Sequence, residues 1–440
     1  MDQSSSPGRS EPGRTVGVSR RRFLGMAGLV GAGAVAGSSI LSGCSSSSGG
    51  TTTIRFLQNK PEVVGYFKDL TAQFNASQKD VVVIHDSTPT PLIPQFVRGA
   101  PPDLALYNYN LETSNFLARG ALLNLAHLPE AATIDPNVQS LVNQFATFED
   151  ETSVLPYSIT AAGVIYNKEL FDQAGVTVPT TWTELMSVCE TFKAKGIVPI
   201  FQTDKDTWTL SQGLFDYVTG SNLDVASFFA TQKQLGPNAG VDASVSFTKN
   251  FKDAADKMVQ LQGYVNPDAA SRSYSDGNVA FAGGKAAMYL QGPWAIGEIV
   301  KINPQAKVGT FALPSSDDKD KVKVRVNLDL ALWIPNASPY QAAATKYLQW
   351  LMRPDVQNTY NAKNLAWSTT KDAPPITDEH EADIAPLLAA KKFYQGAGTY
   401  MPGAIPLGNY LQEFVISQDA DAFLNKLDTD WARYAKRTAV

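Results

Sequence analysis

The amino-acid sequence predicts an α/β fold built from two lobes, and three observations lead to this prediction. An apolar run at 54–57, a helical repeat of apolar residues and a second apolar run at 81–84 follow one another as a βαβ unit. A second block of short apolar segments begins near Tyr157. The chain after residue 43 has ~397 residues, which is more than one compact hydrophobic core usually holds.

The first block supplies a candidate site as well as a sheet. Residues 54–57 and 81–84 are predicted strands, and the helix between them carries Val63, Phe67, Leu70 and Phe74 at helical spacing. Ligands of such sheets bind beyond the carboxyl ends of the strands. The loop 58–62 is therefore a candidate site, and so is the segment 107–110, which follows a further predicted strand at 104–106.

The second block contains two further strands and a helix with clear boundaries. Residues 163–166 and 286–290 are predicted strands, the latter followed by Gly292-Pro293-Trp294. Thr181 and Glu184 have the spacing of a capping box, so a helix is expected to begin there, and Gly196 is suited to close it.

Three more elements complete the prediction. Residues 328–334 alternate between apolar and other residues, so Asn327 and Asp329 are expected on the opposite face of that strand. A helix over 342–352 is expected to stop at Arg353-Pro354. The last helix has one apolar stripe, formed by Phe423, Leu427, Trp431 and Tyr434.

The N-terminus has the features of an export signal. A basic segment, Arg20-Arg21-Arg22, precedes an uncharged run at 23–41 that ends in Leu41-Ser42-Gly43-Cys44. The pattern resembles a twin-arginine signal closed by a lipobox, which implies a signal peptide at 1–43 and lipidation of Cys44. Residues 44–53 are rich in Ser, Gly and Thr and are expected to form a flexible tether. The alternative is a single membrane span, but the run is rich in Gly and Ser and close to the minimum length for one.

Composition excludes several classes of function. The net charge is −5, and residues 1–43 carry five Arg against Asp2 and Glu11, so the remaining chain is at about −8. A mildly acidic protein without a long basic run is not expected to bind nucleic acid. Besides Cys44 there is only Cys189, which lies in register with apolar neighbours and is expected to be buried. The three histidines are scattered, so no metal site is predicted.

An ordered series of segments resembles a known family. The segments are Pro102-Asp103, Gly120–Leu125, Tyr166–Phe171, Pro179–Leu185, Gly284–Met288 and Gly292-Pro293-Trp294. In this order and at this spacing they resemble the extracellular solute-binding proteins of carbohydrate ABC importers, the family that contains maltose-binding protein. No single segment is specific, and the resemblance covers essentially all of 54–440.

The resemblance implies a particular architecture. It is the type II periplasmic-binding-protein fold (Venus flytrap), in which two α/β lobes are joined by a hinge of crossing segments and the sugar binds between them. The N-lobe would comprise 54–158 and 313–362, and the C-lobe 162–310 and 370–440. The crossings would fall near 156–160, 310–314 and 364–368.

The resemblance also implies a function. The chain would bind a sugar or oligosaccharide outside the cytoplasm and deliver it to the membrane permease of an ABC importer. We expect an exported monomer, lipid-anchored to the outer face of the cytoplasmic membrane, with neither catalytic residues nor a cofactor. This chain has Thr160 where maltose-binding protein carries an acidic contact, so maltose itself is not implied.

A sugar site needs an aromatic ring beneath the sugar and polar groups around its edge. Trp294 matches the family position whose ring stacks on sugar, while Trp208 and Trp367 lie in irregular stretches and are equally compatible with the core or with a ligand. Trp182, Trp350 and Trp431 lie on predicted helices and are expected in the core. The predicted polar contacts are Asn59, Glu62, Tyr107, Asn108, Tyr157, Asn327, Asp329, Asn409 and Tyr410. For each of them, a surface or turn position is the competing interpretation.

Two other functions stay open. A binding protein for polyamine, iron or phosphate would share the fold, although Trp294 favours a ring-shaped ligand. An exported glycoside hydrolase would need a carboxylate pair, for which Glu62 and Asp329 are available. No nucleophile elbow or metal signature accompanies them.

Overall fold

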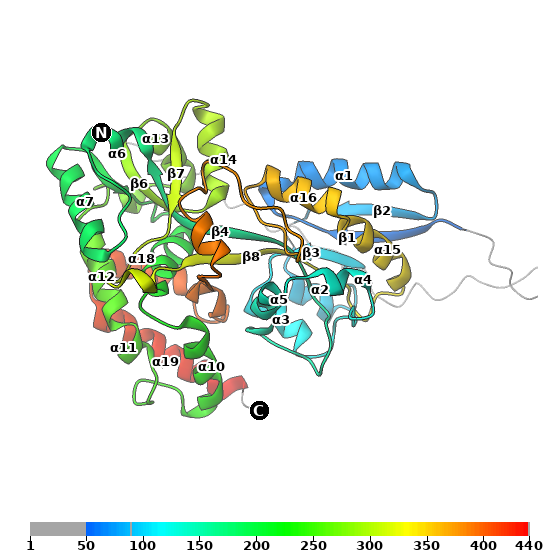
Figure 1. Cartoon of the computed structure of the whole chain (residues 1–440). Helices are drawn as coiled ribbons and strands as arrows, with labels where there is room; N and C mark the ends of the chain where they lie inside the picture. The colour runs from blue at the N-terminus through cyan, green and yellow to red at the C-terminus, as the bar shows by residue number, and fades with distance from the viewer. Residues whose placement is uncertain (1–49, 89, 439–440) are drawn as a thin grey trace, which may run out of the picture. The chain divides into compact units, whose positions relative to one another are not determined.

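The computed structural model describes residues 50–88 and 90–438 (Figure 1). The predicted signal peptide at 1–43 and residues 44–49, with Cys44, lie outside these residues. The described part is a mixed α/β structure, as the sequence predicts. Strand β1 begins at Thr52, so the last two residues of the predicted tether belong to a strand.

Nine strands within 50–88 and 90–438 hydrogen bond in the order β2-β1-β3-β8-β4-β6-β5, with β7 also on β4 and β9 also on β8. Their bounds are β1 Thr52–Leu57, β2 Val81–Asp86, β3 Leu104–Tyr107, β4 Leu155–Asn167, β5 Val198–Phe201, β6 Ala286–Gln291, β7 Val308–Phe311, β8 Val324–Trp333 and β9 Phe393–Gln395. The β1–β2 and β1–β3 pairs are parallel, as the βαβ prediction requires. The β5–β6 pair is parallel as well.

The first lobe is built on β1, β2 and β3. Helices α1 and α15 pack beside β2 and β1, and Figure 1 draws them with α16 around these blue strands. The helices of this lobe are α1 Val64–Ser77, α2 Leu92–Val97, α3 Leu111–Leu117, α4 Pro129–Thr133, α5 Pro136–Asn143, α15 Gln341–Leu351 and α16 Pro354–Lys363. The predicted stop at Arg353-Pro354 ends α15, and Pro354 then opens α16, because proline is well tolerated in the first turn of a helix.

The second lobe is built on β5, β6, β7 and the end of β4. Its helices include α6 Lys168–Ala174, α7 Trp182–Ala194, α8 Thr207–Thr209, α9 Asp216–Gly220, α10 Val225–Leu235, α11 Phe247–Asn250, α12 Lys252–Gln262, α13 Tyr274–Ala282, α14 Pro293–Ile302, α18 Leu407–Ser417 and α19 Ala420–Thr438. A π-helical turn, Leu210–Phe215, joins α8 to α9. The short helix α17, Ala385–Ala389, precedes β9.

Strands β4 and β8 connect the two lobes. Residues 155–162 of β4 pair with β8, and residues 163–167 pair with β6 and β7. Gly163 stands at the change of partner, where a Cβ would collide with the carbonyl oxygen of Phe311. The third predicted crossing lies beside β4, because Trp367 forms an isolated bridge with Ile159 of that strand.

The second predicted crossing, at 310–314, is followed by residues that still contact the second lobe. Ser316 still accepts a hydrogen bond from the Trp182 amide at 3.1 Å, and Asp317 accepts one from the Thr183 amide at 2.8 Å. Strand β8, which comes next in the chain, pairs with β3 of the first lobe and with β4. The lobe boundaries given above stay predictions.

The predicted capping box at α7 forms only in part. The Thr181 hydroxyl accepts a hydrogen bond from the Glu184 amide at 3.1 Å, as expected. The Glu184 carboxylate reaches one residue further back, to the amide and hydroxyl of Thr180 at 2.7 and 2.8 Å. Gly196 follows the helix with φ +71°, which is the left-handed conformation that glycine adopts readily.

The hydrophobic core contains most of the residues predicted for it. Cys189 is fully buried, and burial raises the pKa of its thiol to about 12. On α19, Phe423, Leu427 and Trp431 are buried. In residues 50–88 and 90–438, no helix has both the length and the apolar character that crossing a membrane requires.

Candidate ligand-binding cleft

A cavity of about 490 Å³ is lined by residues from both lobes. This volume falls within the range of small-molecule binding sites. Its lining is polar on the side of the first lobe and partly aromatic on the side of the second. The lining residues are Asn59, Lys60, Pro61, Glu62, Asn108, Tyr109, Asn110, Leu111, Glu112, Trp208, Ser211, Gln212, Asp216, Trp294, Arg325, Asn327, Asp329, Gly398, Thr399, Met401 and Gly403.

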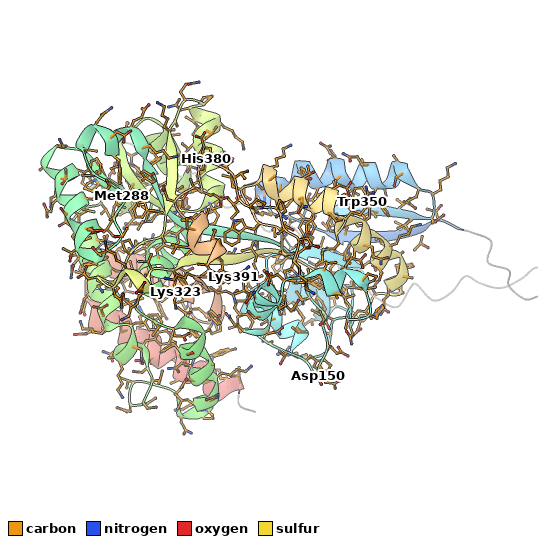
Figure 2. The ribbon with its side chains drawn as sticks, viewed as in Figure 1. Asp150, Met288, Lys323, Trp350, His380 and Lys391 are labelled. Carbon is orange, nitrogen blue, oxygen red and sulfur yellow. The ribbon has the colours of Figure 1, made fainter. Side chains whose placement is uncertain are left out.

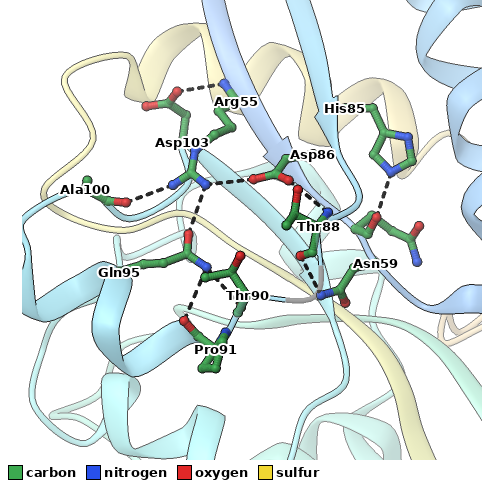
Figure 3. A network of polar contacts seen from close by, with 11 residues as sticks. Arg55, Asn59, His85, Asp86, Thr88, Thr90, Pro91, Gln95, Ala100 and Asp103 are labelled. Atoms are coloured by element: carbon green, nitrogen blue, oxygen red, sulfur yellow. Dashed lines mark hydrogen bonds and ion pairs between the residues drawn. The ribbon is translucent and has the colours of Figure 1, made fainter. Parts of the chain in front are cut away.

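The loop after β1 forms one wall, and hydrogen bonds to the loop after β2 hold it in place (Figure 3). Asn59 Nδ2 donates to the Thr88 carbonyl at 3.2 Å, and His85 Nε2 lies 2.7 Å from the Gln58 carbonyl oxygen. Below this loop, Arg55 joins Asp86 through a contact of 2.8 Å. Burial acts to raise the pKa of Asp86, but hydrogen bonds from Thr88 and Arg55 bring it below its ordinary value.

The segment after β3 forms the adjoining wall. The side chain of Asn108 donates to the Asp329 carbonyl, which ties this segment to β8. Asn110 caps α3 by accepting a hydrogen bond from the Thr113 amide at 3.0 Å. Both walls thus stand at the carboxyl ends of parallel strands, where ligands of such sheets bind.

One face of β8 supplies charged and polar groups. Arg325, Asn327 and Asp329 occupy alternate positions, so they share a face of the strand. Lys60 Nζ lies 2.7 Å from Asp329 Oδ1, and the Ser158 hydroxyl donates to Asp329 Oδ2 at 3.2 Å. The acceptors of Asp329 are therefore engaged by the protein itself.

Two tryptophan rings are the aromatic residues that the second lobe contributes to the cavity lining. The centroids of Trp208 and Trp294 are 6.5 Å apart with an interplanar angle of 57°. Trp208 is 37% exposed although it is a large apolar side chain. Trp294 Nε1 donates to Gln291 Oε1 at 3.1 Å. Gly292 permits this position, because a Cβ there would collide with the Trp294 ring.

A buried ion pair lies at the same cavity. Asp216, on α9, and Arg325, on β8, are both 1% exposed or less, and Arg325 Nη2 lies 3.0 Å from Asp216 Oδ2. Burial raises the pKa of the Asp216 carboxyl, and the charge of Arg325 and the amide of Gly398 oppose that rise.

Seven of the twelve residues predicted to contact a ligand line this cavity. They are Asn59, Glu62, Asn108, Trp208, Trp294, Asn327 and Asp329. Their contact with a ligand stays a prediction. The other five do not line it.

Tyr107 and Tyr157 belong to the first lobe without lining the cavity. Tyr107 is the last residue of β3 and is half-buried. Tyr157 is fully buried between Phe67 and Tyr360, with ring centroids 6.3 and 5.4 Å away. The register of β4 against β8 shifts on both sides of Ser158, and within this irregular stretch Ser158 contacts Asp329 while Tyr157 packs into the core.

Trp367, Asn409 and Tyr410 also lie outside the cavity. Trp367 lines a different cavity, of about 620 Å³, and its backbone pairs with Ile159. Asn409 is exposed on α18, and the Tyr410 hydroxyl donates to Asp430 on α19. Gly408, the residue before Asn409, is the one that packs against Thr207 of α8.

Several lining residues were not predicted. For Arg325 a signal existed, because it is two residues before Asn327 in the same alternating strand. Lys60 lies in the loop 58–62, where the sequence predicts only Asn59 and Glu62 as ligand contacts. Ser211, Gln212 and Asp216 gave no signal. They lie on the π-helical turn and the start of α9, whereas sequence patterns detect only the regular period.

Two relatives found by sequence are sugar-binding proteins by name. A multiple sugar-binding protein of Streptococcus mutans is 27% identical over 74% of this chain and 78% of its own length. A probable sugar-binding periplasmic protein of Rhizobium meliloti is 28% identical over 41% of this chain and 42% of its own length.

Solved structures show the same fold. RafE, solved in complex with raffinose, superposes with a TM-score of 0.74 at 20% identity, over 88% of this chain and all of its own. A chitin oligosaccharide binding protein gives a TM-score of 0.73 at 17% identity, over 88% of this chain and 99% of its own. These likenesses confirm the predicted two-lobed α/β fold.

The family assignment follows from one further match. The model of the bacterial extracellular solute-binding proteins matches residues 60–358, which include most of the two walls of the first lobe, the tryptophan pair and β8. The chain belongs to the bacterial extracellular solute-binding protein family.

Proposed function

We propose that this protein binds a sugar or short oligosaccharide in the cavity between its lobes and delivers it to the permease of an ABC importer. The observation that carries the proposal is the pair Trp208 and Trp294 opposite the polar walls of the first lobe. Sugar rings need an apolar plate and a polar rim, and the cavity offers both. The names of the relatives from S. mutans and R. meliloti point to the same class of ligand.

The direct test is a binding screen. Purified protein is titrated with mono- and oligosaccharides, raffinose and chitin oligosaccharides among them, and the melting temperature is followed, because a ligand that binds the folded state raises it. Calorimetry then gives the affinity of each hit. A panel in which no saccharide changes the melting temperature contradicts the proposal.

We propose that binding is not followed by catalysis. Asp329, one member of the carboxylate pair that a glycoside hydrolase would use, is held by Lys60 and Ser158. Saccharides that bind should therefore be recovered intact after incubation. Release of reducing ends that disappears in Asp329→Asn would overturn this part of the proposal.

A polyamine is the second candidate ligand, favoured by the carboxylates at the cavity. Glu62 and Glu112 both line it, and within the described residues neither has a cationic side chain within 4.0 Å. Carboxylates and tryptophan rings together suit an ammonium group. Spermidine belongs in the same screen, and its binding in place of every saccharide would favour this candidate. Phosphate, by contrast, would be repelled by the same carboxylates.

We propose that the mature protein is anchored at the cell surface as a monomer. The support is the lipobox that ends at Cys44 and the Ser/Gly-rich segment after it. The first strand, β1, begins at Thr52, a few residues after Cys44 in the sequence. Membrane fractionation tests the anchor, and sedimentation of a form lacking residues 1–44 tests the oligomeric state.

A further inference from the structure

The wall segment, defined as residues 398–403, supplies four of the residues that line the candidate cavity: Gly398, Thr399, Met401 and Gly403. It combines the end of a short 3₁₀ helix, Ala397–Tyr400, with the irregular chain that follows it. Two of its four lining residues are glycines, which offer no side chain for packing. The side chain of Tyr400 fixes the middle of the segment by stacking on Phe229, with 4.8 Å between ring centroids, but the Gly398 end needs a contact from another part of the chain.

Asp216 makes the contacts that this position requires. Its Oδ1 accepts a hydrogen bond from the Gly398 amide at 2.7 Å. Its Oδ2 accepts from Arg325 Nε at 3.1 Å. Its backbone carbonyl accepts from the Tyr394 hydroxyl at 2.7 Å. One residue thus binds the wall segment, strand β8 and strand β9.

The chain approaches this carboxylate closely at two glycines. A Cβ at Gly396 would collide with the Asp216 carboxylate, and a Cβ at Gly220, one helical turn along α9, would collide with the Tyr394 ring. Gly396 has φ −59°, so it is the space and not the backbone conformation that requires glycine there. The sequence is therefore adapted on both sides to the close approach of α9 and the segment 394–398.

We propose that Asp216 is a positioning residue, which holds the wall segment and strand β8 in register with the helical turn that carries Ser211 and Gln212 and thereby sets the affinity of the cavity. Asp216 is fully buried and acts through these groups. The proposal rests on the proposed function only in naming the cavity as the binding site.

The test compares two buried aspartates of the same lobe. Asp216→Asn keeps the shape of the side chain but leaves the Arg325 cation buried without its counter-charge. Asp428→Asn is the matched control. Asp428 is 1% exposed and accepts from the Phe247 and Thr248 amides at 2.7 and 2.9 Å, yet it lines no part of the cavity.

The first readout is hydrogen–deuterium exchange of the protein without ligand. We expect peptides that cover 396–403 to exchange at least tenfold faster in Asp216→Asn. The same peptides should exchange at the wild-type rate in Asp428→Asn, even where both variants melt at lower temperature. Unchanged exchange in Asp216→Asn, or equal acceleration in both variants, would overturn the proposal.

A second variant separates position from charge. Gly396→Ala changes no charge but forces the carboxylate and the segment apart, so it should accelerate exchange over the same peptides and serves if Asp216→Asn does not fold. The double variant should exchange little faster than the faster single variant, because both changes break one contact. Additive effects would contradict the shared mechanism.

Affinity is measured with raffinose as the probe. We expect binding at least tenfold weaker in Asp216→Asn and unchanged in Asp428→Asn. Equal affinity of Asp216→Asn and wild type would overturn the link from position to affinity. A wild type that does not bind raffinose counts against raffinose as the ligand, and the exchange measurements then decide the role of Asp216 by themselves.

Discussion

Lys60 and Asp329, which are 269 residues apart in the chain, form an ion pair with 2.7 Å between Nζ and Oδ1. Their side chains are 17% and 5% exposed, so the pair lies largely out of solvent. It joins the loop after β1 to strand β8. One of the two strands that connect the lobes is thus fixed to one wall of the cavity.

We expect Asp329→Asn to weaken both folding and ligand binding. The change leaves Lys60 partly buried without a counter-charge, which should lower the free energy of unfolding by about 1–3 kcal/mol. Denaturant unfolding without ligand measures this decrease in the free energy of unfolding. Calorimetry with the cognate saccharide measures the loss of affinity. Asp80→Asn is the control, since Asp80 pairs with Lys346 at the surface with 79% of its side chain exposed. Its effect on stability should stay within about 0.5 kcal/mol, and an equal effect of both changes would contradict the role of the buried pair.

Trp294→Ala should weaken saccharide binding by about 2–4 kcal/mol, because a buried aromatic anchor usually dominates a small site. Gly292→Ala should also weaken binding, since the added methyl displaces the Trp294 ring. Trp350→Ala is the control. Trp350 packs on Phe74 and Tyr347 at α15, and Figure 2 labels it in the first lobe. Trp350→Ala should lower the stability of the protein and leave its affinity for saccharide unchanged. Unaltered affinity in Trp294→Ala would assign the ring contact to Trp208 instead.

The parts of the site that the sequence predicts are those with a regular local period. Asn59 and Asn108 follow strands whose apolar runs are visible in the sequence, and parallel strands bring their ends together. Asn327 and Asp329 alternate with leucines. In each case the position follows from one short segment, and the structure brings all four to one cavity.

The parts that the sequence did not predict depend on pairing between distant segments. Asp216 pairs with Arg325, which is 109 residues further along the chain. Neither residue type indicates in the sequence that its side chain is buried or which residue it contacts. The sequence predicts Tyr157 as a ligand contact. In the structure its side chain is buried in the core, next to the register shift around Ser158. A shift of this kind is set by the partner strand, so the sequence of β4 alone does not contain it.

Cys44→Ala should release the protein from the membrane without changing saccharide affinity, because the proposed lipid is attached outside the folded part that begins at Thr52. Fractionation of cells and calorimetry of the released protein measure the two effects. A Cys44→Ala protein that is processed and still sediments with membranes would contradict the lipoprotein proposal.

Ligand binding should close the two lobes. The cavity takes residues from both, so a bound saccharide favours the state in which both sets reach it. A micromolar ligand binds with about −8 kcal/mol, which is enough to shift an equilibrium with a gap of a few kcal/mol. Small-angle scattering should give a smaller radius of gyration at saturation. Trp294→Ala at the same saccharide concentration is the control, and an unchanged radius in saturated wild type would indicate a cavity that is closed beforehand.

Glu381 should make the folded state less stable as the pH rises. It lies between α16 and α17, next to His380, which Figure 2 labels, and its side chain is buried with Oε1 lacking a hydrogen-bond partner among the described residues. Burial, and then the charge of Asp378, raises the pKa of Glu381 from 4.5 to about 8. The folded protein therefore holds a proton that the unfolded chain releases above pH 4.5. This contribution to stability is complete below the unfolded pKa and is lost as the pH rises through the folded pKa.

The expected loss between pH 5 and pH 8 is about 3–5 kcal/mol, at 1.36 kcal/mol for each unit of pKa shift. Urea unfolding at a series of pH values measures it as the difference between wild type and Glu381→Gln. Because the amide does not titrate, the variant should gain stability relative to wild type as the pH rises. Glu379→Gln changes an exposed carboxyl two residues away and should follow the wild-type curve. If the free energy of unfolding of Glu381→Gln changes with pH in the same way as that of wild type, Glu381 is ionised in the folded protein. The segment before α17 then accommodates its charge.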